Sequence, residues 1–418
     1  MRFGTADPLL DCPTITGSAV YKVGGEPMPQ EPQRSLGVLD LARWLAGPAR
    51  IGLTPVEIVA GCCERLLTAG VPLYRVRLGQ RLANPLIAAW GVIWVRGSGA
   101  EEYAVPRTTM ATSSYTGSPF EHVVKTRTRF RRSLRDLDPT HDHPVLFELA
   151  AAGSADYLAI PIAYGDGSVQ GASFTTDRVQ GFSLEEVAFI EELSPFLAAG
   201  LEPAAMRRSA ESLLRTYLGD GPAKRVMAGA IRRGDWIEIE AAVLLTDLLG
   251  YTALSEQLPA DQLLDHLGRY LEVVVESVQS EDGDVLKFIG DGVLSIFPVR
   301  EGGPSEAIRR ALRALEAALT RADQVGDLHF IGCLHTGPVT YGNIGSPNRL
   351  DFTVVGPTVN LVSRLEIISK STRSVAVCSR EVAALLPAEA ARALGTFALR
   401  GVPGEQTVFR LCGLRNRT

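Results

Sequence analysis

Two short apolar runs joined by a tight acidic turn stand out in the second half of the chain. Residues 283–289 and 292–297 are mostly apolar, and the turn between them reads Gly290-Asp291-Gly292. Asp-Gly between apolar runs is a strong local signal of a β-hairpin. Lys287 stands four residues before the acid. The pattern predicts a hairpin with Asp291 at its tip, and an Asp-Gly pair alone is usually no more than a turn.

A second acid ends another apolar run upstream. Residues 243–248 read as a buried strand that carries Asp247 and is followed by a turn at Gly250. A long helix is expected at about residues 260–280, between this strand and the hairpin. A β-α-β-β order brings the strands side by side, and two carboxylates at strand ends are typical of a site for a pair of divalent cations. The two acids together therefore predict a metal site.

A third polar pattern follows a predicted strand at residues 351–355. The turn Gly356-Pro357 precedes an expected helix with Asn360 and Arg364, four residues apart and so on one helical face. Such residues are usually ordinary surface groups. An arginine directly after a strand and a turn nevertheless offers a planar, permanently charged fork for a phosphate.

The first half of the chain has a mixed α/β pattern. We expect a helix at residues 54–69 that begins with Thr-Pro, strands at 74–78 and 88–95, a hairpin at 157–163 and 168–175, and a helix capped by Ser183. The fold class predicted for the whole chain is α/β (α+β). The expected parts are a flexible arm at 1–34, a first domain at 35–201, a helical linker or dimerisation element at 202–237 and a second domain at 238–418.

The linker contains an apolar stripe at helical spacing. It consists of Met206, Ala210, Leu213, Leu214, Tyr217 and Leu218. Such a stripe either packs on its own domain or pairs with the same helix of a second chain. The sequence leaves both alternatives open.

Composition and charge narrow the function classes. At 418 residues the chain is long enough for two domains, and a net charge of −5 without a long basic run argues against nucleic acid as a partner. No apolar run reaches the roughly 18 residues that span a bilayer, and the start has no signal-peptide core. We therefore expect a cytoplasmic protein without a membrane span. The six cysteines have no metal-ligand spacing, which predicts free thiols.

The chain contains no Gly-Lys dipeptide, so it has no P-loop. A bound nucleotide would be held by metal ions and side chains instead. The Gly-Gly-Asp/Glu-Glu-Phe signature of diguanylate cyclases is also absent.

These blocks, in this order, resemble the catalytic domain of class III nucleotidyl cyclases, from about residue 238 to residue 411. The resemblance implies a ferredoxin-like domain in which Asp247, Asp291 and the backbone carbonyl of Leu248 bind two Mg²⁺ or Mn²⁺ ions. It implies that Asn360 orients the ribose and that Arg364 stabilises the α-phosphate.

The resemblance also assigns the substrate-binding residues. Lys287 and Thr353 fall where the family reads the purine, and together they indicate ATP. Arg400 stands where the family has a lysine for the terminal phosphates, and Thr353 replaces the aspartate of mammalian cyclases. The implied protein is an adenylyl cyclase that acts as a homodimer with two composite sites. The alternatives are a guanylyl cyclase and a ligand-binding regulator with a silent cyclase domain.

The end of the first domain resembles a GAF-type sensory domain. The resemblance rests on the strands at residues 156–162 and 171–174 and on the helix start Phe182-Ser183-Leu184-Glu185-Glu186. It leaves open whether the domain senses a cyclic nucleotide, another small molecule or only a protein contact. His122, His141 and His143 could ligate haem or a metal, although isolated histidines near loops are usually solvated.

Overall fold

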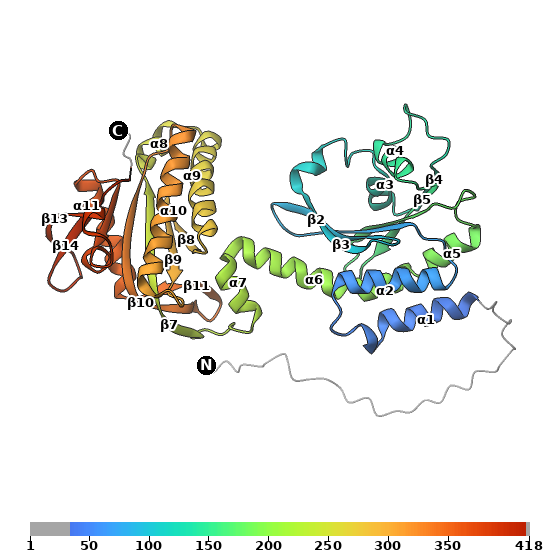
Figure 1. Ribbon diagram of the computed structural model, residues 1–418, viewed down its shortest axis with the longest axis horizontal. Helices are drawn as coiled ribbons and strands as arrows, with labels where there is room; N and C mark the ends of the chain where they lie inside the picture. The colour runs from blue at the N-terminus through green and yellow to red at the C-terminus, as the bar shows by residue number, and fades with distance from the viewer. Residues whose placement is uncertain (1–33, 415–418) are drawn as a thin grey trace, which may run out of the picture.

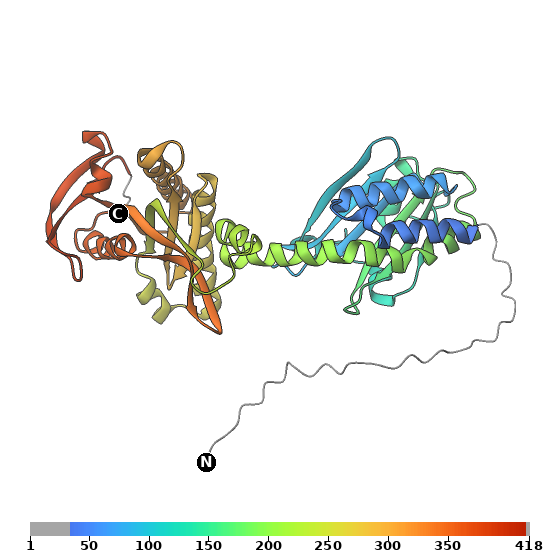
Figure 2. The same ribbon diagram turned by 90° about the horizontal axis from the view of Figure 1, so that it is seen from below.

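The computed structural model describes residues 34–414, which form two lobes joined by a long helix, α6 (Ser194–Leu218) (Figures 1 and 2). The arm predicted at residues 1–34 lies, except for its last residue, outside the described residues. None of the helices within residues 34–414 is long and apolar enough to cross a membrane.

The N-terminal lobe is built on a six-stranded antiparallel sheet with the order β3-β2-β1-β6-β5-β4. The strands are β1 (Arg75–Arg81), β2 (Ile87–Val95), β3 (Gly99–Pro106), β4 (Phe130–Ser133), β5 (Asp156–Ala163) and β6 (Val169–Thr176). The predicted strands and the predicted hairpin in this lobe are confirmed. The tight turn before β6 is completed by Gly167, whose φ of 80° suits glycine.

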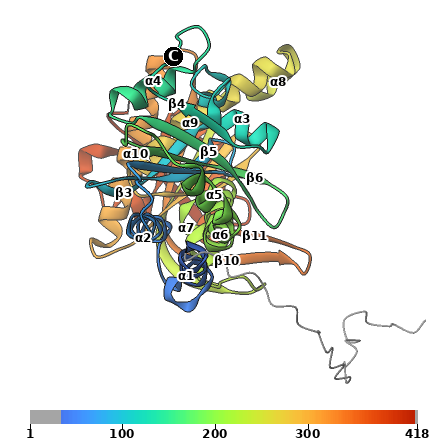
Figure 3. The same cartoon turned by 90° about the vertical axis from the view of Figure 1, so that its right-hand side faces the viewer.

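Helices cover both faces of this sheet, as the end-on view in Figure 3 shows. One face carries α1 (Arg34–Ala46), α2 (Pro55–Thr68), α5 (Leu184–Glu192) and the first half of α6, and the other carries α3 (Pro119–Thr126), α4 (Pro144–Ala151) and the 3-10 helix η2 (Arg107–Ala111). Alternation along β5 divides its side chains: Leu158 and Ile160 enter the core under α1 and α2, and Tyr157 and Ala159 enter the core under α3 and α4.

Two helix starts in this lobe follow the predicted capping chemistry. Thr54 and Glu57 form a capping box on α2, and Ser183 and Glu186 form another on α5.

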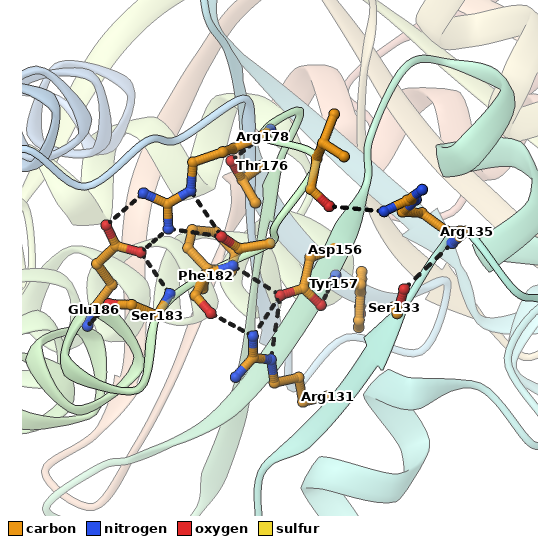
Figure 4. A network of polar contacts seen from close by, with 12 residues as sticks. Arg131, Ser133, Arg135, Asp156, Tyr157, Thr176, Arg178, Phe182, Ser183 and Glu186 are labelled. Atoms are coloured by element: carbon orange, nitrogen blue, oxygen red, sulfur yellow. Dashed lines mark hydrogen bonds and ion pairs between the residues drawn. The ribbon is translucent and has the colours of Figure 1, made fainter.

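A buried polar network fixes the corner between β6 and α5 (Figure 4). Asp156 Oδ2 accepts hydrogen bonds from a terminal nitrogen of Arg131 at 2.8 Å and from the backbone nitrogen of Phe182 at 2.9 Å. Arg178 forms an ion pair with Glu186 in the first turn of α5. The network therefore holds the start of α5, the helix that precedes α6.

The predicted helix that carries the apolar stripe at residues 206–218 is confirmed as the second half of α6. Helix α6 begins inside the N-terminal lobe and ends at Gly219, whose φ of 88° breaks the helix before α7 (Asp220–Met227). The side chain of Asn84, in the β1–β2 loop, contacts α6. Its Nδ2 donates hydrogen bonds to Ser212 Oγ at 2.7 Å and to Thr216 Oγ1 at 3.0 Å. The loop of the N-terminal lobe thus lies directly against the linker helix.

The C-terminal lobe is built on an eight-stranded sheet with the order β13-β14-β12-β10-β7-β9-β8, and β11 pairs with β10. The strands are β7 (Trp236–Leu248), β8 (Asp284–Ile289), β9 (Gly292–Pro298), β10 (Phe330–Ser346), β11 (Arg349–Val355), β12 (Ala376–Ser379), β13 (Ala391–Ala398) and β14 (Glu405–Leu411). Its helices are α8 (Tyr251–Gln257), α9 (Ala260–Ser280), α10 (Gly303–Val325), α11 (Pro357–Ser371) and α12 (Arg380–Ala383).

The central strand β7 is buried on both faces. Leu244 packs in the core with α9 and α10, and its neighbours Val243 and Leu245 pack in the core with α11. The segments β7, α9, β8, β9, α10 and β10 follow the β-α-β-β-α-β order of a ferredoxin-like fold. The helix predicted at 260–280 and the hairpin predicted around Asp291 are confirmed.

The predicted free thiols are confirmed for the cysteines within the described ranges. Cys62, Cys63, Cys333 and Cys378 are buried and Cys412 is exposed. Cys12 lies outside them.

Candidate functional site

The two candidate metal-binding aspartates lie at neighbouring strand ends in the C-terminal lobe. In the β7–β9 ladder, Asp247 is the register partner of Gly292. Asp291 is the residue before Gly292, in the turn between β8 and β9. A Cβ atom on Gly292 would lie 3.6 Å from Asp247 Oδ1. The two carboxylates therefore lie close together, although they come from separate segments of the chain.

Asp247 is buried and is surrounded by charge. Burial raises its pKa, the negative charges of Asp291 and Glu366 add to that rise, and a hydrogen bond from Lys370 opposes it. Lys370 Nζ lies 2.5 Å from Asp247 Oδ2 and 2.7 Å from Glu366 Oε1. Partial burial alone would lower the pKa of Lys370, but these hydrogen bonds to Asp247 and Glu366 raise it above its usual value.

Sequence reasoning missed Lys370. The Glu366–Lys370 spacing of four residues predicts no more than an ion pair on one helix. The contact with Asp247 arises only because α11 packs across β7, which no local pattern along the chain reveals.

These residues suit a hard divalent cation. Carboxylate and carbonyl oxygens are the ligands that Mg²⁺ and Mn²⁺ prefer. Asp247 and Asp291 supply two carboxylates. Leu248 directly follows Asp247 as the last residue of β7, so its backbone carbonyl oxygen is a further candidate ligand. No group of three His, Cys, Asp or Glu side chains within residues 34–414 could hold a metal ion. The remaining ligands would therefore come from water and from the oxygens of a substrate.

Lys287 contacts the strand that carries Thr353. Lys287 on β8 forms an ion pair with Asp351 on β11. Thr353 is two residues further along β11, so it faces the same way as Asp351, whereas Phe352 enters the core. Thr353 is buried and Lys287 is half-exposed. Asp351 is a further residue that sequence reasoning did not single out.

Arg364 and Arg400 also meet. Helix α11 begins after Gly356, whose φ of 137° is suited to glycine. Arg364 Nε donates a hydrogen bond to the carbonyl oxygen of Arg400, in the turn between β13 and β14, at 3.2 Å. Asn360 and Ile367 are exposed on the same face of α11, with Ile367 56% exposed.

Asn360 lies near the start of α11, whereas the candidate metal-binding aspartate Asp247 lies near its end. At its start, Thr358 Oγ1 donates to the carbonyl oxygen of Pro338, and near its end Lys370 contacts Asp247. Asn360 precedes Lys370 by ten residues, which is about 15 Å along a helix axis. Asn360 is therefore displaced along α11 from the two aspartates of its own chain.

The three histidines of the N-terminal lobe do not form a cluster. His143 caps α4 and its Nε2 lies 2.8 Å from the carbonyl oxygen of Ser113. His141 contacts Asp138, and the ring of His122 packs against Phe130. The described residues thus give no support to a haem or metal site at these histidines.

Comparisons with known proteins find matches for the C-terminal lobe. Residues 238–413 match the family described as "Adenylate and Guanylate cyclase catalytic domain". "Adenylate cyclase 1" of Rhizobium meliloti is 28% identical over 191 residues, which is 44% of this chain and 29% of that protein. The terminal-differentiation-specific adenylate cyclase of Dictyostelium discoideum is 28% identical over 151 residues, 34% of this chain and 7% of that protein. The chain thus spans less than a third of the length of these relatives.

Solved structures give similar matches. The adenylyl cyclase CyaB from P. aeruginosa is 26% identical, with 43% of this chain and 97% of that chain covered and a TM-score of 0.37. The guanylyl cyclase Cya2 is 25% identical, with 43% and 94% covered and a TM-score of 0.37. Cyclases of both purine specificities are therefore among the similar proteins.

Proposed function

We propose that the protein is an adenylyl cyclase, because residues 238–413 match the adenylate and guanylate cyclase catalytic domain. It converts ATP to 3′,5′-cyclic AMP and pyrophosphate. The observation that carries the proposal is the pair of carboxylates, Asp247 and Asp291, at the adjoining ends of β7 and the β8–β9 hairpin. The family generally depends on divalent metal ions, and this pair offers the oxygen ligands that such ions need.

Asp247, Asp291 and the Leu248 carbonyl would hold two Mg²⁺ or Mn²⁺ ions. When bound, such ions lower the pKa of an attacking hydroxyl and stabilise charge on the leaving oxygens. Before any cation binds, Lys370 supplies the positive charge that Asp247 needs in its buried position. Lys370 would lose this role where a bound cation supplies the positive charge instead.

The remaining residues position the nucleotide. Asn360 orients the ribose so that its 3′-oxygen attacks the α-phosphorus, and the bond from that phosphorus to the pyrophosphate oxygen breaks as the hydroxyl proton leaves. Arg364 neutralises the charge that grows on the α-phosphate, and Arg400 binds the terminal phosphates. Positioning and charge neutralisation supply most of the rate enhancement in reactions of this type.

Lys287 and Thr353 select the purine in this proposal. The ammonium group of Lys287 donates to N1 of adenine, and the Thr353 hydroxyl accepts from the 6-amino group. Guanine carries a donor at N1 and an acceptor at position 6, so the same pair would fit it poorly. The ion pair between Lys287 and Asp351 supports this assignment because it holds the lysine on the face that Thr353 shares.

We further propose a homodimer with two composite sites. The displacement of Asn360 along α11 from the metal-binding aspartates supports a site in which a second copy supplies Asn360 and Arg364. Exposed Ile367 beside them and the exposed linker residues Met206 and Tyr217 are suited to contact with that copy. A two-fold axis would make the two sites identical. The N-terminal lobe is, in this proposal, a GAF-like sensory domain that acts through α6.

The test is a product assay on the purified full chain with ATP or GTP and with Mg²⁺ or Mn²⁺. The proposal requires cyclic AMP from ATP at a higher kcat/KM than cyclic GMP from GTP. A preference for GTP would favour the guanylyl cyclase alternative. Nucleotide binding without any cyclic product would favour the silent regulator.

A further inference from the structure

The N-terminal lobe contains a cavity of about 330 Å³ on the sheet face that carries α3 and α4. Its lining comes entirely from residues 75–173, so it is separate from the catalytic lobe. Strands β1 and β6 form the floor, and α3, α4 and η2 form the walls. The volume lies within the roughly 300–1,000 Å³ of small-molecule sites.

Glycines create the room for aromatic side chains beside this floor. Gly79 pairs with Gly171 on β6 and with Gly91 on β2, so three glycines stand side by side across the sheet. A Cβ atom on Gly79 would lie 2.9 Å from the Tyr103 hydroxyl, and one on Gly171 would lie 2.6 Å from the ring of Phe120. Tyr103 and Phe120 can lie against the sheet only because these side chains are absent.

Two arginines enter the cavity from β1. Alternation along the strand sends Val76 and Leu78 into the core of the opposite face, and Arg75 and Arg77 into the cavity. The Arg77 guanidinium lies 4.5 Å from the ring centre of Tyr103 and 4.8 Å from that of Phe120. Such contacts fix the orientation of a guanidinium without neutralising it.

Within residues 34–414, neither Arg75 nor Arg77 forms an ion pair with an acid. Burial and the like charge of Arg77 lower the pKa of Arg75. The one carboxylate in the lining belongs to Glu148, which is exposed on α4, and a third arginine, Arg81, also lines the cavity. The lining therefore carries excess positive charge, and placing such charge without a partner costs free energy.

The floor also offers a neutral hydroxyl. Tyr157 on β5 lies in the lining together with Ser173, and burial raises the pKa of Tyr157 to about 12. It stays protonated at neutral pH and is available as a donor or an acceptor.

We propose that this cavity binds a small organic anion, whose carboxylate or phosphate group is held by Arg75 and Arg77 and whose apolar body packs among Tyr103 and Phe120. Guanidinium groups pair with both anions through two parallel hydrogen bonds. The aromatic walls favour a planar body over a bare inorganic ion.

The same segments lead to the linker helix. Arg107, at the start of η2, donates from Nε to the carbonyl oxygen of Asn84 at 3.1 Å, and the Asn84 side chain contacts Ser212 and Thr216 on α6. An anion that moves β1 or η2 would therefore also move residues that contact α6.

Titration calorimetry of the full chain tests the proposal with four probes: benzoate, phenyl phosphate, benzyl alcohol and inorganic phosphate. We expect benzoate or phenyl phosphate to bind measurably below roughly 10 mM, a range that includes weak fragment-sized ligands. Benzyl alcohol and inorganic phosphate should bind at least roughly tenfold more weakly. Benzyl alcohol has no anionic group for the arginines, and inorganic phosphate has no apolar body for the aromatic walls. The ranking of benzoate against phenyl phosphate identifies the anionic group.

Variants locate the binding. Arg75→Gln and Arg77→Gln should each weaken the anionic aromatic probe at least roughly tenfold, and Arg77→Lys should retain part of the affinity. Arg43→Gln, an exposed arginine on the opposite face of the sheet, and Arg364→Ala in the catalytic lobe should bind it as the unaltered chain does. Arg75→Gln should leave the melting temperature without probe unchanged or higher, because it removes a positive charge that has no acidic partner.

Three results would each overturn the proposal. They are no binding of either anionic aromatic probe, equal affinity for benzyl alcohol, and unchanged affinity in both glutamine variants. Since every readout is binding to the N-terminal lobe, these results are independent of whether the C-terminal lobe makes cyclic AMP.

Discussion

In the C-terminal lobe, Lys370 and Lys287 each contact an aspartate, whereas Arg75 and Arg77 of the N-terminal lobe line a cavity without an acidic partner among residues 34–414. Each of these lysines offsets the charge of the aspartate that it contacts. The positive charge of the two arginines is not offset by an ion pair among residues 34–414, and a bound anion would neutralise it. The comparison shows that a charged site can be prepared for its ligand in two ways: by a counter-charge that the ligand replaces, or by an excess charge that the ligand neutralises.

The same contrast applies within the N-terminal lobe. Arg131 has Asp156 as a buried partner, and Arg75 has none. If buried charge is costly only when it is unpaired, removing Asp156 and removing Arg75 should change stability in different directions.

The largest expected effect is on catalysis. Asp291→Asn should lower the rate of cyclic AMP formation by more than roughly a hundredfold, because loss of a direct ligand should exceed the roughly 10- to 100-fold cost of altering outer-shell partners. The variant should keep its fold, since Asp291 lies in a partly exposed turn. Steady-state assays measure this effect, and Asp265→Asn on α9 is the matched control. Near-normal turnover in Asp291→Asn would remove this residue from the metal site.

The next effect is on stability. Asp156→Asn should lower the free energy of unfolding of the N-terminal lobe by about 3 kcal/mol, because it leaves Arg131 without its buried counter-charge. Denaturant unfolding followed by tryptophan fluorescence measures this change. If Arg75→Gln were equally destabilising, the contrast between paired and unpaired charge would be wrong.

A smaller effect is expected at Lys370. Lys370→Met should destabilise the metal-free chain by about 1 kcal/mol, since the ion pair with Asp247 is partly exposed to solvent. It should also increase the rise in melting temperature that Mn²⁺ produces, because the cation then supplies a missing counter-charge. Lys125→Met, at an exposed ion pair on α3, is the control. A reduced response to Mn²⁺ in Lys370→Met would mean that Lys370 assists cation binding rather than competing with it.

The free energy by which the site prefers ATP over GTP should also change. Lys287→Glu should reduce the preference for ATP over GTP by about 1–3 kcal/mol, the cost of leaving one buried polar group unpaired. The comparison of kcat/KM for the two nucleotides measures it. An unchanged ratio would exclude Lys287 as the residue that reads the purine.

Local patterns predicted the parts of the fold that local interactions determine. The hairpin at Asp291, the long helix α9 and the caps at Thr54 and Ser183 depend on neighbouring residues, and all were predicted. The contact between Lys370 and Asp247 depends on the packing of α11 across β7, so no spacing in the sequence predicts it. The helix that carries the apolar stripe at residues 206–218 was also predicted, and Gly219, a glycine with positive φ, ends it.

The cavity of the N-terminal lobe was not predicted, although part of its signal is in the sequence. Arg75 and Arg77 alternate with Val76 and Leu78, which would have placed two charges on one face of a strand. Whether that face meets solvent or a cavity depends on α3 and α4, which come later in the chain. The location of the site therefore required the fold.

Subunit mixing tests the central claim, a metal-dependent cyclase site shared between two chains, most directly. Asp291→Asn and Arg364→Ala chains, each inactive alone, are combined in equal amounts, and cyclic AMP formation is measured after subunit exchange is verified by mass spectrometry. Half of the dimers should then be mixed with one intact site of two, which predicts recovery of roughly a quarter of the unaltered activity. A mixture that exchanges subunits and stays inactive would contradict the composite site.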